Sequence, residues 1–254
     1  MKIIDTPSPN FDARPQGQAV DMLVLHYTGM KTMDEALARL SDAEAKVSAH
    51  YLIDEDGAIH RLVAEDKRAW HAGVSSWRGY ADINARSIGV ELVNPGHEFG
   101  YRPFPEAQMA ALILLAKGIL ARLAIPPRNV VAHADVAPSR KQDPGELFDW
   151  QRLAQAGIGV WPGRNSLERG QGPRASLPAS GSLAPPARPA PEGHETTSQA
   201  GHMVSRLSHY GYDVSDADAA ILAFQRHFRP ARTDGIADAE GAGILDALLK
   251  LVQE

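Results

Sequence analysis

Three residues that can bind a metal ion lie at points where a sheet would bring them together. His26 ends the apolar run MLVLH, His133 ends the apolar run NVVAH, and Asp143 follows in the loop APSRKQDPG. Strand ends lie at the rim of an α/β sheet, where binding sites are commonly built. Because the chain contains no cysteine, a metal here needs imidazole and carboxylate ligands. Two imidazoles and one carboxylate leave a fourth tetrahedral position for water, the pattern of a catalytic zinc site. For each histidine alone, the alternative is a hydrogen-bonded residue at the rim.

Two ionisable residues could act beside such a metal. Glu91 interrupts the apolar run SIGVELV, where a carboxylate is costly to bury unless it is paired or used. Lys141 lies two residues before Asp143, so one loop could supply both a ligand and a cation. A carboxylate base and a cation beside a metal-activated water are what amide hydrolysis requires. The alternative is a structural ion pair between Glu91 and Lys141.

The elements that must position these residues are predicted from apolar spacing. Short apolar runs bounded by turn residues predict strands at 21–27, 49–53, 59–63, 87–93 and 129–133. Glu55-Asp56-Gly57 is a hairpin signal between two of them. Helical spacing predicts one helix at 33–40 and a second that opens at Pro105 and ends near Ala124. We therefore expect an α/β fold with a mixed central β-sheet flanked by helices.

The composition divides the chain into three parts. Residues 163–198 are rich in Pro, Gly and Ser and contain few large apolar residues, which predicts a semi-extended linker. The linker separates a first domain, 1–162, from a last one, 199–254. Helical apolar spacing at 202–210, 215–227 and 239–252 predicts that this last domain is a small three-helix unit.

Charge and hydropathy exclude several partners. A formal net charge of −5 argues against nucleic acid as the partner. We expect no membrane segment, because the longest apolar stretch, 109–125, is broken by Lys117 and Arg122. The N-terminal residues contain no apolar segment of a signal peptide. The expectation is a cytoplasmic protein, or a periplasmic one if an export signal has been removed, and no protein partner is implied.

Five motifs in order carry a resemblance to a known family. They are LHYTG at 25–29, SAHYLI at 48–53, AWHAGVSSWRG at 69–79, NARSIGVELVN at 84–94 and AHADVAPSRKQDPG at 132–145. Together they resemble the zinc-dependent N-acetylmuramoyl-L-alanine amidases of the AmpD/AmiD type. The resemblance spans the first domain and implies a fold related to that of peptidoglycan recognition proteins.

The resemblance also implies roles for individual residues. His26, His133 and Asp143 match the ligands of Zn²⁺, Glu91 matches the catalytic glutamate, and Lys141 matches the lysine near the scissile carbonyl. The implied reaction is hydrolysis of the amide bond between N-acetylmuramic acid, or its 1,6-anhydro form, and L-alanine. Glu91 would be the general base and acid, and Lys141 would stabilise the oxyanion. The substrates would be muropeptides or peptidoglycan.

Other parts of the resemblance leave alternatives open. His71 and Asn84 lie in loops that line the substrate groove in similar proteins, so each is expected to contact substrate or to form local hydrogen bonds. The last domain resembles a three-helix peptidoglycan-binding domain through LSHYGY, ILAFQRHF and TDGIADAE. Its alternative is a helical appendage used for packing or dimerisation. For the whole chain, the alternative function is a non-catalytic, zinc-containing peptidoglycan-recognition protein.

Overall fold

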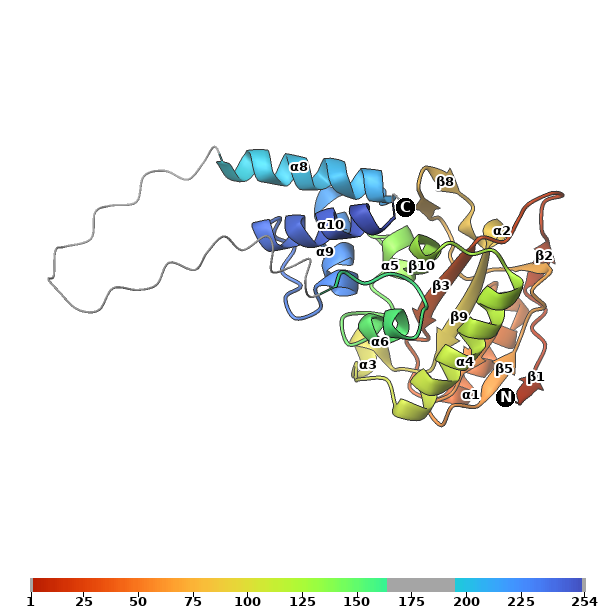
Figure 1. Cartoon of the computed structure of the whole chain (residues 1–254). Coiled ribbons are helices and arrows are strands. Elements are labelled where there is room, and N and C mark those ends of the chain that lie inside the picture. Colours follow the sequence, from red (N-terminus) through yellow and green to blue (C-terminus); the bar gives the residue numbers. More distant parts are fainter. Residues whose placement is uncertain (1, 164–194, 253–254) are drawn as a thin grey trace, which may run out of the picture.

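A six-stranded sheet forms the centre of the molecule (Figure 1). The computed structural model describes residues 2–163 and 195–252. The strands lie in the order β1-β5-β4-β9-β3-β10. They span Ile3–Asp5 (β1), Met22–Tyr27 (β3), Tyr51–Ile53 (β4), Ile59–Arg61 (β5), Ser87–Leu92 (β9) and Val130–Ala132 (β10). Strands β4 and β5 pair antiparallel and the other neighbours pair parallel, which confirms the predicted mixed sheet.

The central strands are apolar along most of their length because helices cover both faces of the sheet. Helix α4 (Glu106–Arg122) packs on one face, through a cluster that includes Leu112 and the β4 residue Ile53. Helix α1 (Met33–Ser41) packs on the other face, against the alternate β4 residue Leu52. Successive strand residues point to opposite faces, so strands covered on both sides need continuous apolar runs.

Short helices lie beside the strand ends. They are α2 (Ile83–Arg86), α3 (Gly96–Phe99), α5 (His133–Val136) and α6 (Trp150–Gln155), with 3-10 turns at Ala43–Ala45 and Pro127–Asn129. His133 thus begins α5, whereas the sequence predicted it at the end of a strand. The chain turns there because the Asp135 carboxylate accepts a 2.7 Å hydrogen bond from the backbone N–H of Ala132.

Two small ribbons were not predicted from the sequence. Strand β2 (Phe11–Ala13) pairs antiparallel with β6 (Lys67–Ala69), and β7 (Ser76–Trp77) pairs antiparallel with β8 (Tyr80–Ala81). Each strand has two or three residues and lacks a continuous apolar run. The chain between β6 and β7 carries His71, whose Nδ1 lies 3.0 Å from His26 Nε2.

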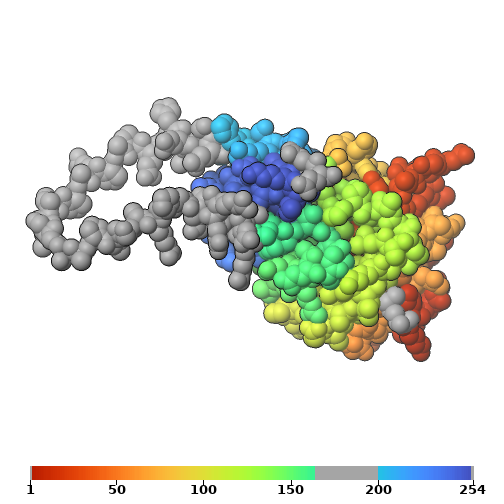
Figure 2. Space-filling model, viewed as in Figure 1, coloured from red at the N-terminus to blue at the C-terminus, as the bar shows by residue number. Residues whose placement is uncertain are grey.

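The predicted C-terminal helices are present. They span Glu195–Tyr210 (α8), Ala217–Phe228 (α9) and Ala239–Leu251 (α10). Most of the predicted linker, 163–198, lies outside the described residues. The three helices pack against the first part of the chain, and α9 contacts α5 (Figures 1 and 2). One continuous cluster of buried apolar side chains contains both sheet residues such as Leu25 and helix residues such as Phe224.

None of the helices in the described ranges combines the length and the apolar composition that a membrane span requires.

Candidate active site

Three ligand atoms converge at the rim of the sheet. His26 lies near the end of β3, His133 begins α5, and Asp143 lies in the loop before α6. His26 Nδ1 is 2.9 Å from His133 Nδ1 and 3.2 Å from Asp143 Oδ2, and the remaining pair is 3.0 Å apart. Ligand atoms around a tetrahedral zinc ion are about 3.3 Å apart, given metal–ligand distances of about 2.0–2.1 Å. The geometry therefore fits a metal ion of this size, and the structure brings the three predicted ligands together.

The protonation of the cluster also fits a metal site. Burial, and then the neighbouring His133, lower the pKa of His26 to about 4. Burial alone would raise the pKa of Asp143, but His133 and His26 hold it well below its usual range. At neutral pH the cluster therefore presents a neutral imidazole at His26 and an ionised carboxylate, the forms that bind metal ions.

Glu91 faces the cluster from the neighbouring strand. On β9 it lies opposite His26 in the parallel register of β3 and β9. Its Oε2 is buried and has no hydrogen-bond partner among the residues that the structure describes. Burial, and then the charge of Asp143, raise the pKa of the Glu91 carboxyl well above its usual value, against the opposing effect of Lys141. An unpaired buried carboxylate oxygen is unusual in a folded protein and marks a group that a bound molecule would satisfy.

Lys141 is exposed and lines the same cleft. No ion pair links it to Glu91 in the described structure, so the structural pair considered from the sequence is not formed there. The cleft has a volume of about 360 Å³, within the range of small-molecule sites. Besides Lys141, two arginines line it, Arg39 and Arg140, and an adjoining pocket adds Lys46. The surroundings of the cluster are therefore cationic.

His71 and Asn84 lie beside the cluster and form hydrogen bonds within the protein. His71 is 8% exposed, and its two ring nitrogens lie 3.0 Å from His26 Nε2 and 3.1 Å from Ser87 Oγ. The side-chain amide oxygen of Asn84 (Oδ1) accepts hydrogen bonds from the backbone N–H groups of His71 and Ala72. These are the local contacts that the sequence left as the alternative, and substrate contact by either residue stays a prediction.

A second polar group borders the cleft and was not found from the sequence. The Tyr27 hydroxyl lies 2.9 Å from His97 Nδ1, and His97 Nε2 lies 3.1 Å from Glu146. The His97 ring stacks on Tyr101. The tyrosine that follows His26 in the run LHY was the only local signal, because its partners are 70 and 119 positions further along the chain.

The C-terminal helices reach the turn that carries His133. We call this contact the Asp135 hub: Asp135, Tyr212 and His227. The Tyr212 hydroxyl donates to Asp135 Oδ1 at 2.6 Å, and His227 Nδ1 lies 2.6 Å from Asp135 Oδ2. All three side chains are buried. The carboxylate that shapes the β10–α5 turn is thus hydrogen-bonded to the C-terminal part of the chain.

Known proteins resemble this chain both in overall fold and in the region that carries the cluster. Residues 16–146 match the family described as N-acetylmuramoyl-L-alanine amidase (Amidase_2). The N-acetylmuramoyl-L-alanine amidase AmiD of Escherichia coli (strain K12) is 42% identical over 273 residues, covering 98% of this chain and 90% of AmiD.

Solved structures of amidases are similar to this chain over nearly its whole length. AmiD from E. coli, in complex with anhydro-N-acetylmuramic acid-L-Ala-D-gamma-Glu-L-Lys, matches with a TM-score of 0.76 at 40% identity, covering 93% of this chain and 92% of that one. AmpDh3 from Pseudomonas aeruginosa, in complex with anhydromuramic pentapeptide, matches with a TM-score of 0.72 at 35% identity, covering 94% and 95%.

The fold, the buried His-His-Asp cluster and these matches define the class of the protein: it is an amidase with a metal-site cluster at the rim of a mixed sheet. More narrowly, the chain belongs to the N-acetylmuramoyl-L-alanine amidase family, in the group that includes AmiD and AmpD. The prediction that the chain is an enzyme is therefore confirmed, in preference to the alternative of a non-catalytic recognition protein.

Proposed function

We propose that this chain is a zinc-dependent hydrolase of the amide bond between N-acetylmuramic acid, or its 1,6-anhydro form, and L-alanine in muropeptides or peptidoglycan. The observation that carries the proposal is the convergence of His26, His133 and Asp143 beside Glu91, one of whose carboxylate oxygens has no hydrogen-bond partner in the described part of the chain. When bound, zinc supplies Lewis-acid chemistry, lowering the pKa of a water to about 7 and polarising an adjacent carbonyl.

Glu91 takes the proton of the attacking water and returns it to the leaving amine of L-alanine. Two features support this assignment. Its buried Oε2 has no hydrogen-bond partner within residues 2–163 and 195–252 and is therefore available to a water or an amine. Burial and Asp143 raise its pKa, so the protonated form that must donate to the amine is more accessible than for an exposed glutamate.

Lys141 stabilises the oxyanion that develops on the scissile carbonyl. The ammonium group is exposed in the cleft and is not neutralised by Glu91. A single preorganised contact of this kind typically lowers the barrier by about 3–4 kcal/mol.

The cationic lining favours an acidic stem peptide. The peptide bound to the AmiD relative contains a γ-linked D-Glu, whose α-carboxylate is free. Arg39, Arg140 and Lys46 line the cleft and its adjoining pocket and would attract such a carboxylate. We infer that the peptide, and not the sugar alone, contributes to recognition.

The roles are tested with Glu91→Gln and Lys141→Met, assayed for bound zinc by elemental analysis and for turnover by mass spectrometry of the released peptide. We expect Glu91→Gln to keep zinc and to lose at least about 100-fold in turnover. We expect Lys141→Met to lose about 100- to 1000-fold with unchanged zinc content. The matched controls are the exposed residues Glu98 and Lys117, changed in the same way. Full activity of Glu91→Gln would remove the glutamate from the mechanism.

A further inference from the structure

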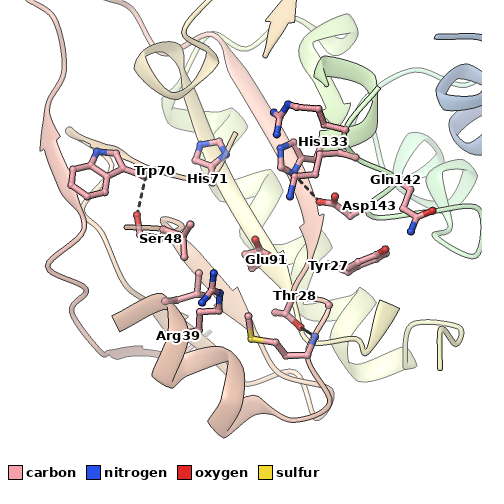
Figure 3. A pocket seen from close by; sticks show the side chains of 16 residues that line it. Tyr27, Thr28, Arg39, Ser48, Trp70, His71, Glu91, His133, Gln142 and Asp143 are labelled. Atoms are coloured by element: carbon pink, nitrogen blue, oxygen red, sulfur yellow. Dashed lines mark hydrogen bonds and ion pairs between the residues drawn. The ribbon is translucent and has the colours of Figure 1, made fainter. Parts of the chain in front are cut away.

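The segment between β6 and β7 offers a hydrogen-bond partner to each histidine of the metal cluster. His71 faces His26, and the carbonyl oxygen of Ala72 lies 3.1 Å from His133 Nε2. Figure 3 places the His71 ring in the wall of the cleft near His133. Partners of this kind fix which ring nitrogen carries the proton and therefore which one is left to bind a metal.

On the His26 side, the proton positions follow from a chain of hydrogen bonds. The Ser87 hydroxyl donates its one hydrogen to the carbonyl oxygen of Ile83 at 2.7 Å. Its oxygen must then act as the acceptor toward His71 Nε2, which lies 3.1 Å away. In the neutral His71 ring, Nδ1 is consequently unprotonated and accepts from His26 Nε2–H at 3.0 Å. The lone pair of His26 is left on Nδ1, the atom that faces the cluster.

On the His133 side, the partner is a carbonyl oxygen, which can only accept. His133 Nε2 therefore carries the hydrogen, and the lone pair again lies on Nδ1. With both histidines in this state, two lone pairs and the Asp143 carboxylate point at one another across 2.9–3.2 Å. Three acceptors this close repel one another unless a cation lies between them.

The surrounding residues hold this segment in place. Asn84 Oδ1 accepts from the backbone N–H groups of His71 at 3.1 Å and Ala72 at 2.8 Å, so it fixes both partners at once. Gly89 of β9 leaves room for the imidazole, because a Cβ there would lie 2.5–2.7 Å from the His71 ring. A glycine inside a buried strand is explained when another group must approach the backbone closely.

We propose that His71 and the Ala72 carbonyl, held by Asn84, are positioning groups that set both histidine ligands to bind metal through Nδ1. The proposal rests on the zinc site of the proposed function and adds three residues that prepare it. It also gives His71 and Asn84 a role that does not require contact with substrate.

The test measures zinc affinity of the full chain by competition with a chromophoric chelator. His71→Leu removes both hydrogen bonds, and we expect zinc to bind about 10- to 100-fold more weakly. His71→Gln keeps an acceptor and a donor side by side, and we expect it to recover most of the affinity. The control is His209→Gln, an exposed imidazole on α8, which should leave the affinity unchanged.

A second variant and a direct measurement guard against misfolding. Ser87→Ala leaves the His71 ring in place and removes the acceptor of its Nε2–H, together with the bond that Ser87 donates to Ile83. We expect a smaller loss of zinc affinity than in His71→Leu. In the zinc-loaded protein, long-range ¹H–¹⁵N correlation of the imidazoles should find His71 protonated at Nε2. Zinc binding by folded His71→Leu as tight as in the parent, or a proton on His71 Nδ1, would overturn the inference. A parent chain that binds no zinc would instead refute the proposed function.

Discussion

Replacing Tyr212, which lies between α8 and α9, by phenylalanine removes one hydrogen bond to the turn that carries His133. The lost bond is 2.6 Å long, both side chains are buried, and the acceptor is the Asp135 carboxylate. A hydrogen bond to a charged group contributes about 1.5–3 kcal/mol to stability. For a chain of this size, 1 kcal/mol corresponds to about 2–4 °C in Tm. We therefore expect Tyr212→Phe to lower the Tm by about 3–12 °C.

The assay is differential scanning calorimetry of the metal-free full chain, so that metal binding does not mask the change. The continuous apolar cluster predicts one cooperative transition for both parts of the chain. The matched control is Tyr80→Phe, because the Tyr80 ring is 60% exposed and packs on the Arg86 guanidinium, a contact phenylalanine keeps. An unchanged Tm in Tyr212→Phe, or two separate transitions of which only one shifts, would refute the coupling through the Asp135 hub.

Three further perturbations follow from the same geometry. Glu91→Gln should raise the Tm of the metal-free protein by at least about 2 °C at pH 8. Because the pKa of Glu91 is raised in the folded state, the ionised carboxylate destabilises the fold. The gain in Tm should therefore vanish below about pH 4.3, where the carboxyl is protonated in the unfolded chain as well. An equal gain at pH 8 and below about pH 4.3 would contradict this reasoning. Gly96→Ala, at φ +67°, would place a Cβ 2.6 Å from the Tyr27 ring and should lower the free energy of urea unfolding by about 2–5 kcal/mol. The control Gly79→Ala, at φ +77° with no described atom within 4 Å of the added Cβ, should lower it by about 1–2 kcal/mol, and equal losses would exclude the clash. Removing zinc with a chelator, from a free concentration about 1000 times Kd, should lower stability by about 4 kcal/mol and the Tm by about 8–16 °C, and a constant Tm would argue against a metal in the fold.

The parts of the fold that could be predicted from sequence are those with strong local patterns. β3 and β9 are covered on both faces and read as apolar runs, and Glu55-Asp56-Gly57 marked the β4–β5 hairpin. The β2–β6 and β7–β8 ribbons left no such pattern, because they are short and sit outside the main sheet. Their position still matters, since the segment after β6 carries His71.

The site also contains residues that could be predicted from sequence and contacts that could not. His26, His133 and Asp143 could be predicted to meet, because strand ends share a rim and the family motifs match them. The hydrogen bonds from His71 to Ser87, and from Tyr27 through His97, depend on side-chain direction, which sequence spacing does not reveal. The Asp135 hub was hidden for another reason: residues 163–198 gave no indication that the helices beyond them would contact the β10–α5 turn.

The central claim is metal-dependent cleavage between the muramic acid and L-alanine. Its most direct test is mass spectrometry of a defined muropeptide mixture, with both anhydro and reducing-end sugars, after incubation with the full chain and zinc. We predict free stem peptides that begin at L-alanine, absent after chelation and restored by added zinc. Intact muropeptides in the presence of zinc-loaded protein would contradict the proposed function.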